Sequence, residues 1–287
     1  MAANFYQVTQ KSIEVYDDSE LSLGKNNLQF TTIPMVHWPE TMVTFESTNK
    51  ILFTGDACGS YGTLDGGRFD DELDYTQYYE ENETYFSNIV GKYCAHTQRA
   101  LKKIAKYEIK MIAATHGMIW RSHIDFILDK YNKLSTYQTE PGAVIVYGSM
   151  YGNTAKMAEI IARQLAVRGV KNIRVYDSSK THPSFIISDI FKYKALILGS
   201  AAYNNAMFPT VETLLTTIKH MGIKDHLLGI FGSFSWNGGG VKNLEKFAEE
   251  IKWEVVGQSL EEKGAMKPDH FNRYVDLAIC IDDKILV

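Results

Sequence analysis

The chain has 287 residues, of which 45% are hydrophobic and 22% are charged, and its formal net charge is −4. This composition is ordinary for a globular protein with two cores, and the slight acidity gives no support to nucleic-acid binding. The sequence shows no run of eighteen apolar residues and no basic-then-apolar leader, so we expect neither a membrane span nor a secretory signal.

Three strand-like segments in the first half each lead to a side chain that can bind a metal. Residues 28–30 precede the segment that holds His37, residues 50–55 end at Asp56, and residues 109–114 end just before His116. Imidazole and carboxylate groups at strand ends are how a rigid scaffold aims ligands at a metal. Taken alone, each is more often an ordinary turn residue. The prediction of a metal site therefore depends on all three together.

The middle of the chain predicts helices and then a boundary. Residues 70–106 suit one or two helices, because residues 70–72 are acidic and the later apolar residues keep helical spacing. We expect the acidic run to form a solvated face. A further helix is predicted over residues 123–134. The polar stretch 135–142, which contains Pro141 and Gly142, predicts the boundary between domains 1–140 and 141–287.

The second half contains three buried-strand patterns, each followed by a polar loop. Residues 143–147, 195–198 and 227–231 are the strands, and every loop after them is rich in small polar residues or glycine. In a doubly wound sheet, ligands lie beyond the carboxyl ends of the strands, so the loops should converge on one crevice.

The first of these loops suits a phosphate. It opens a helical pattern, and backbone N–H groups at a helix start favour an anion. Ser149, Asn153 and Thr154 add donors without adding net charge. An ordinary βα turn would explain this loop by itself, but the other two loops supply Tyr203 and Trp236 as flat faces for a ring system.

Residues 141–287 resemble a flavodoxin-type FMN domain. More narrowly, Tyr203-Asn204-Asn205 before Phe208-Pro209, and Trp236 before a glycine run, resemble the flavodoxin half of flavodiiron proteins. FAD is not favoured, because no Gly-x-Gly-x-x-Gly fingerprint follows a strand. The resemblance implies FMN held by Ser149, Met150, Tyr151, Gly152, Asn153, Thr154, Ser200, Ala201, Ala202, Tyr203, Asn204, Asn205, Ser233, Phe234, Ser235, Trp236, Asn237 and Gly238.

The first half resembles the metallo-β-lactamase-like domain of the same family, through the His-Trp-Pro, Thr-Gly-Asp-Ala and Thr-His-Gly segments. The resemblance implies that His37 binds one iron, that Asp56 bridges two irons and that His116 binds the other. Cys58 lies two residues from Asp56, but a role as a small buried residue is favoured over ligation. The expected fold class is α/β, with a C-terminal flavodoxin-like doubly wound parallel sheet and a partial N-terminal metallo-β-lactamase-like αββα domain.

The family's metal site also needs a His-x-Glu-x-Asp-His cluster upstream of the His-Trp-Pro segment. No histidine precedes His37 in this sequence, and three ligands cannot satisfy two irons. The sequence resembles a family member without its first strands and helices, which would expose a strand edge and an apolar face in residues 28–60. We expect a complementary polypeptide with the missing cluster to cover them, in preference to a second copy of the chain or a rebuilt local fold.

The resemblance implies an oxidoreductase that reduces dioxygen or nitric oxide at a di-iron centre supplied by FMN, with activity dependent on the complementary chain. It also implies a head-to-tail homo-oligomer, in which one subunit's flavin meets the other's metal site. Cys58, Cys94 and Cys280 are widely spaced, which predicts free thiols in a reducing cytoplasm. Electrons should come from a separate donor such as a rubredoxin or a flavin reductase.

Two alternatives remain open at this stage. The chain is an FMN-binding electron carrier whose N-terminal domain is metal-free and serves docking only, or it is a vestigial assembly partner with an empty flavin pocket. The three complete flavin loops argue against the second alternative, whereas the missing ligand cluster keeps the first one open.

Overall fold

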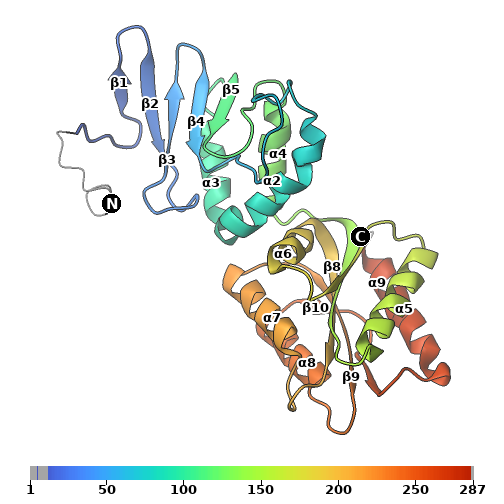
Figure 1. Ribbon diagram of the computed structural model, residues 1–287. Helices are drawn as coiled ribbons and strands as arrows, with labels where there is room; N and C mark the ends of the chain where they lie inside the picture. Colours follow the sequence, from blue (N-terminus) through green and yellow to red (C-terminus); the bar gives the residue numbers. More distant parts are fainter. Residues whose placement is uncertain (1–4, 6–11, 286–287) are drawn as a thin grey trace.

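The computed structural model describes Phe5 and residues 12–285, and it contains two sheets that follow one another along the chain (Figure 1). The first sheet has the strand order β1-β2-β3-β4-β5. The first four strands pair antiparallel, beginning with the hairpin of β1 and β2, whereas β4 and β5 pair in parallel. Its strands are β1 (Glu20–Ser22), β2 (Asn27–Thr32), β3 (Met42–Glu46), β4 (Ile51–Gly55) and β5 (Met111–Ala114).

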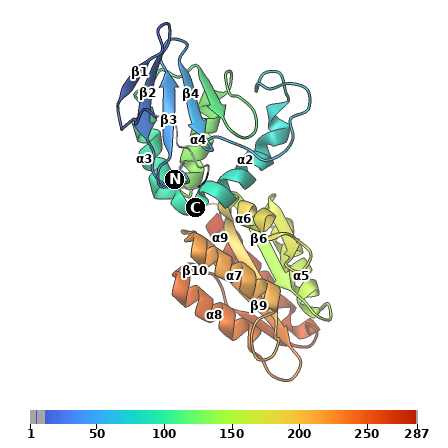
Figure 2. The ribbon, with the colours of Figure 1, turned by 60° about the vertical axis from the view of Figure 1, so that its left-hand side comes forward.

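Three helices lie together beside the first sheet (Figure 2): α2 (Tyr79–Tyr85), α3 (Cys94–Ile104) and α4 (Ile124–Ser135). The helical region expected over 70–106 is broken into shorter pieces. A 3₁₀ turn (Tyr75–Tyr78) precedes α2, and a π-helix (Phe86–Val90) and a second 3₁₀ turn (Gly91–Tyr93) separate α2 from α3. Gly91 is required at that turn, because a Cβ there would lie 2.7 Å from the Phe191 ring.

The prediction that the acidic run 70–72 forms a solvated face was wrong for Asp70, which is completely buried. Its carboxylate accepts hydrogen bonds from the backbone N–H groups of Arg121, Ser122 and His123 at the start of α4. Burial acts to raise the pKa of Asp70, but these backbone hydrogen bonds together lower it by more. The pKa therefore lies below its usual value. Asp70 therefore holds the amino end of α4 against the loop before α2, in which Asp70 lies.

The second sheet is parallel and has the order β10-β9-β8-β6-β7, with β11 also paired to β9. It is made of β6 (Glu140–Gly148), β7 (Ile173–Asp177), β8 (Tyr193–Ala201), β9 (Leu227–Phe234), β10 (Glu254–Val255) and β11 (Leu260–Lys263). Its helices are α5 (Asn153–Val167), α6 (Pro183–Lys192), α7 (Pro209–Met221), α8 (Gly240–Ile251) and α9 (Phe271–Ile285), with a 3₁₀ turn at Pro268–His270.

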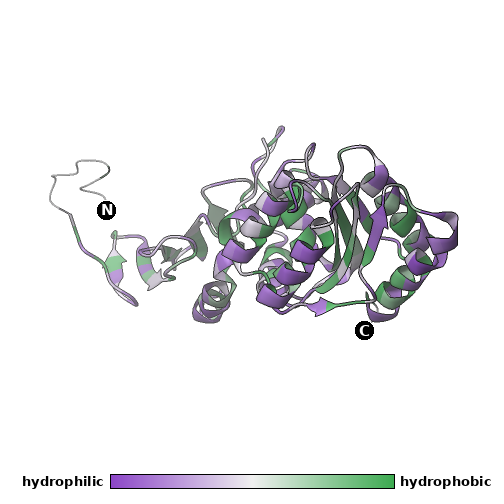
Figure 3. Ribbon diagram, turned by 90° about the horizontal axis from the view of Figure 1, so that it is seen from below, coloured by the Kyte–Doolittle hydropathy of each residue, from purple (hydrophilic) through white to green (hydrophobic). Residues whose placement is uncertain are grey.

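Side chains of the central strands alternate between two helical layers. Ala143 and Ile145 of β6 pack in one core cluster with residues of α5 and α9, whereas Val144 and Val146 pack in another with residues of α6, α7 and α8. A parallel sheet covered on both faces explains why its strands are almost continuously apolar in sequence. Figure 3 shows these hydrophobic strands between helices whose outer faces are hydrophilic.

The two halves share a packed junction. Phe86 of the first half and Phe191 of the second meet edge to face, with ring centroids 6.3 Å apart, and Thr84 is hydrogen-bonded to Ser188. The boundary expected between residues 140 and 141 falls at the start of β6, and it stays a prediction. In the part of the chain that the structure describes, no helix combines the length and apolar character needed to cross a bilayer.

Candidate functional site

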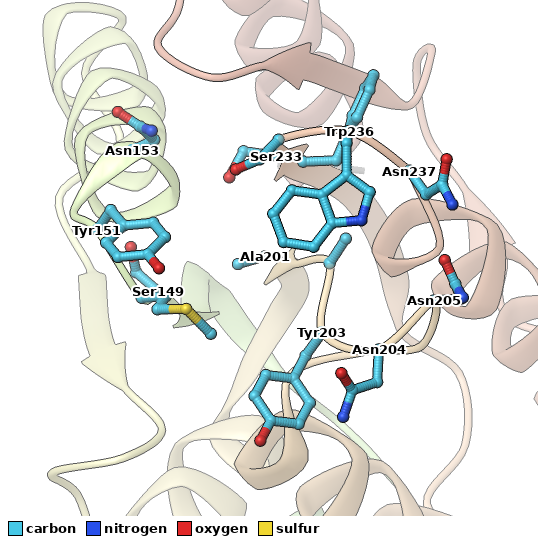
Figure 4. A pocket seen from close by; sticks show the side chains of 14 residues that line it. Ser149, Tyr151, Asn153, Ala201, Tyr203, Asn204, Asn205, Ser233, Trp236 and Asn237 are labelled. Carbon is cyan, nitrogen blue, oxygen red and sulfur yellow. The ribbon is translucent and has the colours of Figure 1, made fainter.

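A pocket of about 240 Å³ lies at the carboxyl ends of β6, β8 and β9, where the three expected loops converge (Figure 4). Every lining residue is one of the predicted cofactor-binding residues. The four other predicted residues, Gly152, Thr154, Ser200 and Gly238, do not line the pocket. The lining consists of Ser149, Met150, Tyr151, Asn153, Ala201, Ala202, Tyr203, Asn204, Asn205, Ser233, Phe234, Ser235, Trp236 and Asn237.

The loop after β6 forms an anion cradle at the start of α5. Gly152 has the left-handed φ of 84° that glycine favours, and its N–H donates to the hydroxyl of Ser149 at 3.1 Å. Among the described residues, no side chain caps the start of α5, so the first backbone N–H groups of the helix remain available to an anion. Asn153 lines the pocket beside them and adds an uncharged donor.

Two of the expected residues act by holding the loops in place. Thr154 is completely buried, and its hydroxyl is 2.8 Å from that of Ser233, which connects α5 to the carboxyl end of β9. Ser200 is also completely buried, and its hydroxyl accepts a hydrogen bond from the backbone N–H of Phe208 at 2.8 Å. The two hydroxyls therefore fix the relative positions of the loops from beneath the pocket.

The loop after β8 is a tight two-residue turn. Tyr203 and Ala206 exchange backbone hydrogen bonds of 3.0 and 2.8 Å, and Asn204 and Asn205 both have positive φ. Gly239 of the neighbouring loop, with φ 153°, lies against this turn, because a Cβ there would be 2.4 Å from the Asn205 carbonyl oxygen. The glycine run after Trp236 is thus explained by close backbone approach.

Large side chains are unusually exposed around the pocket. Trp236 is 81% exposed, Tyr151 is 78% exposed and Tyr203 is 40% exposed. Figure 4 shows that Trp236 and Tyr203 project from different loops at the same pocket. Exposed aromatic surface gathered around a polar cavity is typical of a site that binds a flat ring system.

The three predicted metal ligands meet at one carboxylate. The Nε2 atom of His37 is 3.2 Å from Oδ2 of Asp56, and Nε2 of His116 is 3.4 Å from Oδ1. Thr115, which the sequence did not single out, donates a hydrogen bond to the same Oδ1 at 2.8 Å. Each oxygen of Asp56 therefore faces one histidine, and this is the arrangement that a bridging carboxylate needs.

Tyr85 is a second neighbour that sequence reasoning treated only as part of a helix. Its ring lies 5.9 Å from that of His116, and burial together with the charge of Asp56 raises its pKa well above the usual value. Cys58 is buried, and burial raises the pKa of its thiol to about 12, so it remains a neutral thiol.

The donors present do not complete a site for two irons. Two imidazoles and one carboxylate supply too few ligands for two metal ions. Across Phe5 and residues 12–285, no group of three or more His, Cys, Asp or Glu side chains has an arrangement that could hold a metal ion. The two histidines instead lie against the Asp56 carboxylate, at 3.2 and 3.4 Å.

Comparison with known proteins finds a family model that matches each half of the chain. A flavodoxin family model matches residues 145–275, and a model described as ODP family beta lactamase matches residues 2–117. With the two observed sheets, these matches confirm the expected fold class.

Among curated proteins, an uncharacterized protein of Methanocaldococcus jannaschii is 31% identical over 255 residues, which cover 88% of this chain and 64% of that protein. The anaerobic nitric oxide reductase flavorubredoxin of Vibrio vulnificus is 29% identical over 265 residues, which cover 88% of this chain and 53% of the relative. The chain thus spans between about half and two thirds of the length of these relatives.

Two solved structures are similar over nearly the whole chain. The rubredoxin oxygen:oxidoreductase of the anaerobe Desulfovibrio gigas has a TM-score of 0.92 and 26% identity, covering 99% of this chain and 72% of the other. The flavodiiron protein of Giardia intestinalis has a TM-score of 0.88 and 26% identity, covering 95% of this chain and 69% of the other.

Proposed function

We propose that this chain, which belongs to the flavodiiron protein family, binds FMN at the ends of β6, β8 and β9 and delivers electrons for the reduction of dioxygen or nitric oxide. The observation that carries this proposal is the convergence of an anion cradle and exposed aromatic faces on one pocket of about 240 Å³. Bound FMN supplies a reversible two-electron store. The chain's own residues bind it, orient it and limit its contact with water.

The polar and aromatic parts of the pocket divide this work. The free N–H groups at the start of α5, with Asn153, suit the phosphate, because they offer donors without a fixed charge that would trap other anions. Tyr203 and Trp236 suit the two sides of the ring, since flat aromatic faces stack on a flat heterocycle. These positions support FMN, and the individual contacts are part of the proposal.

We further propose that a complementary polypeptide completes the metal site around Asp56. The first sheet supports this. Leu52 and Ile112, which are paired neighbours on one face of the sheet, are completely buried. On the opposite face, Thr44 pairs with Phe53, and Phe53 is 46% exposed although it lies in the middle of β4. An apolar residue exposed at the centre of a sheet is a typical sign of a missing packing partner.

The oligomer and the electron donor follow from the family and belong to the proposal. A head-to-tail homo-oligomer would bring the exposed Trp236 and Tyr151 of one subunit towards the metal half of another. The printed names of the relatives, rubredoxin oxygen:oxidoreductase and flavorubredoxin, favour a rubredoxin-type donor.

A second candidate function is an FMN electron carrier whose first domain binds no metal. It is favoured by one observation: among the described residues, no group of three or more His, Cys, Asp or Glu side chains, including His37, Asp56 and His116, has an arrangement that could hold a metal ion. In this case the first sheet would serve as a docking surface.

A titration of the purified, flavin-free chain with FMN tests the proposal. We expect one FMN per chain, detected by quenching of its fluorescence, and iron retained only when a polypeptide with the family's His-x-Glu-x-Asp-His cluster is present. A chain that takes up no FMN would refute the flavin function. Two irons retained by the isolated chain would refute the split metal site, and no iron in either sample would favour the electron carrier.

A further inference from the structure

A small apolar cavity lies between the first sheet and α3, directly behind two of the predicted metal ligands. The volume open to the centre of a water-sized sphere is about 20 Å³. Val36, which precedes His37, and Ala57, which follows Asp56, both line it. Further lining comes from Val43 of β3 and from Ala100 and Ile104 of α3, all of which are buried.

Three hydroxyl groups near the cavity each make a hydrogen bond within the protein. The hydroxyl of Thr54 donates to the Ala57 carbonyl oxygen at 2.6 Å, and that of Thr97 donates to the Tyr93 carbonyl oxygen at 3.2 Å. The Tyr131 hydroxyl accepts the backbone N–H of Cys58 at 2.8 Å. Since a buried water needs about two to four polar partners, this cavity should stay dry.

The size and apolar walls of the cavity limit which molecules can bind there. A cavity needs about 10–15 Å³ in this measure to hold one water molecule, so about 20 Å³ admits one very small molecule. The dry apolar walls exclude ions and water. An uncharged diatomic gas satisfies both conditions, and small residues at positions 57 and 100 keep the space open where leucine would fill it.

We propose that this cavity binds one molecule of dioxygen or nitric oxide. It would hold the gas beside the backbone that carries His37 and Asp56, and so raise the local concentration of the diatomic at the metal half. The biological meaning of the cavity rests on the proposed function. The binding itself requires neither iron nor electrons, so it is tested independently.

Dioxygen and nitric oxide are both paramagnetic, and either gas in the cavity should enhance the relaxation of nearby methyl groups. We would measure methyl relaxation of the full chain with oxidised flavin under dioxygen, under nitric oxide without oxygen, and under nitrogen as the diamagnetic baseline. The methyl groups of Val36, Val43 and Ile104 should show a larger relaxation enhancement than those of Ile161 and Ile281, which are buried in the second domain. This difference is called the excess below. An excess with one gas only would identify the occupant.

Two variants separate binding from simple gas permeation. Ala100→Leu should fill the cavity and abolish the excess, whereas Ala95→Leu, the same change at an exposed position of α3, should preserve it. Ile104→Val enlarges the cavity without overpacking and should increase the excess, which keeps the test valid if Ala100→Leu does not fold. Equal enhancement in both cores, or an excess unaffected by filling and enlargement, would show an ordinary packing void, while FMN binding would remain as a separate result.

Discussion

Glu83 provides a sharp test of how the two halves are held together. It lies on α2 and is 3% exposed, and its carboxylate contacts the ammonium groups of Lys130 on α4 and Lys192 at the end of α6. The Lys192 contact, at 2.8 Å, connects the first half to the second. Glu83→Gln keeps the shape of the side chain and removes its charge. Lys192 then loses its carboxylate partner, and Lys130 keeps only the more distant carboxylate of Glu140, at 4.0 Å.

The expected loss of unfolding free energy is about 3–5 kcal/mol, the usual cost of removing one partner from a buried ion pair. Glu80→Gln is the matched control, because Glu80 lies on the same helix and also pairs across the junction, with Arg174 at 3.2 Å. Glu80 is 74% exposed and Arg174 is 44% exposed, so this change should cost about 0–1 kcal/mol.

Urea unfolding of the flavin-loaded protein measures the loss of unfolding free energy in each variant. With a slope of about 3 kcal/mol per molar urea, the Glu83→Gln midpoint should fall by at least about 1 M, whereas the Glu80→Gln midpoint should move little. Equal shifts for the two variants would refute the reasoning that burial makes Glu83 decisive.

The pH dependence of Glu83→Gln gives an independent check. Burial lowers the pKa of Lys192, but the hydrogen bond and charge of Glu83 raise it more, so the wild-type pKa lies above its usual value. Without Glu83, burial should depress that pKa. The variant's penalty is then present while Lys192 is protonated and should shrink as pH rises through the lysine range. A penalty independent of pH would point to lost packing instead.

Three further predictions concern the flavin loop, the metal ligands and a surface carboxylate. Asn153→Asp should weaken FMN binding by about 2–4 kcal/mol, because a carboxylate would lie a few ångströms from the phosphate, while riboflavin, which has no phosphate, should bind as before in the same quenching titration. Equal losses for both flavins would contradict this placement of the phosphate. Asp56→Ala should abolish dioxygen or nitric oxide consumption by the assembled protein and leave FMN binding unchanged; initial rates equal to wild type would mean that the metal half is idle. The hydrogen bonds from the Lys103 ammonium group and the Thr32 backbone N–H lower the pKa of Asp17 to about 2, so its stabilising contribution is present above its unfolded pKa of about 3.9 and is lost as pH falls through about 2. Lys103→Ala should return the carboxyl pKa of Asp17 towards the usual value in an NMR titration, and an unchanged pKa would exclude Lys103 as the cause.

The flavin pocket was predictable because its signal is local and repeated. Each central strand of a parallel sheet is a continuous apolar run, and the loop after it must reach the same edge of the sheet. Three strand-loop patterns therefore located the pocket, and the resemblance to flavodoxins implied the residues that line it. The same patterns did not reveal that Thr154 and Ser200 are completely buried, because the side on which a hydroxyl lies depends on how neighbouring loops pack.

The predicted metal ligands show a similar division between what the sequence indicates and what the tertiary structure adds. Their positions at strand ends, with the family resemblance, predicted that His37, Asp56 and His116 come together, and the structure brings both histidines within 3.4 Å of the Asp56 carboxylate. The contact from Thr115 and the nearness of Tyr85 came only from the tertiary structure. The same is true of Asp70, whose partners are backbone groups about fifty residues further along the chain.

The sequence by itself determined the order of the two domains, three strands of the first sheet, the three central strands of the second and the loops that form the candidate flavin site, because hydrophobic period and turn chemistry act over a few neighbouring residues. The tertiary structure alone decided which charged groups are buried, that Phe53 is exposed in the middle of β4 and where the apolar cavity lies. Glu83, Phe53 and Ala100 look unremarkable in sequence. Their roles arise from surfaces that meet only after segments distant in the chain have packed together.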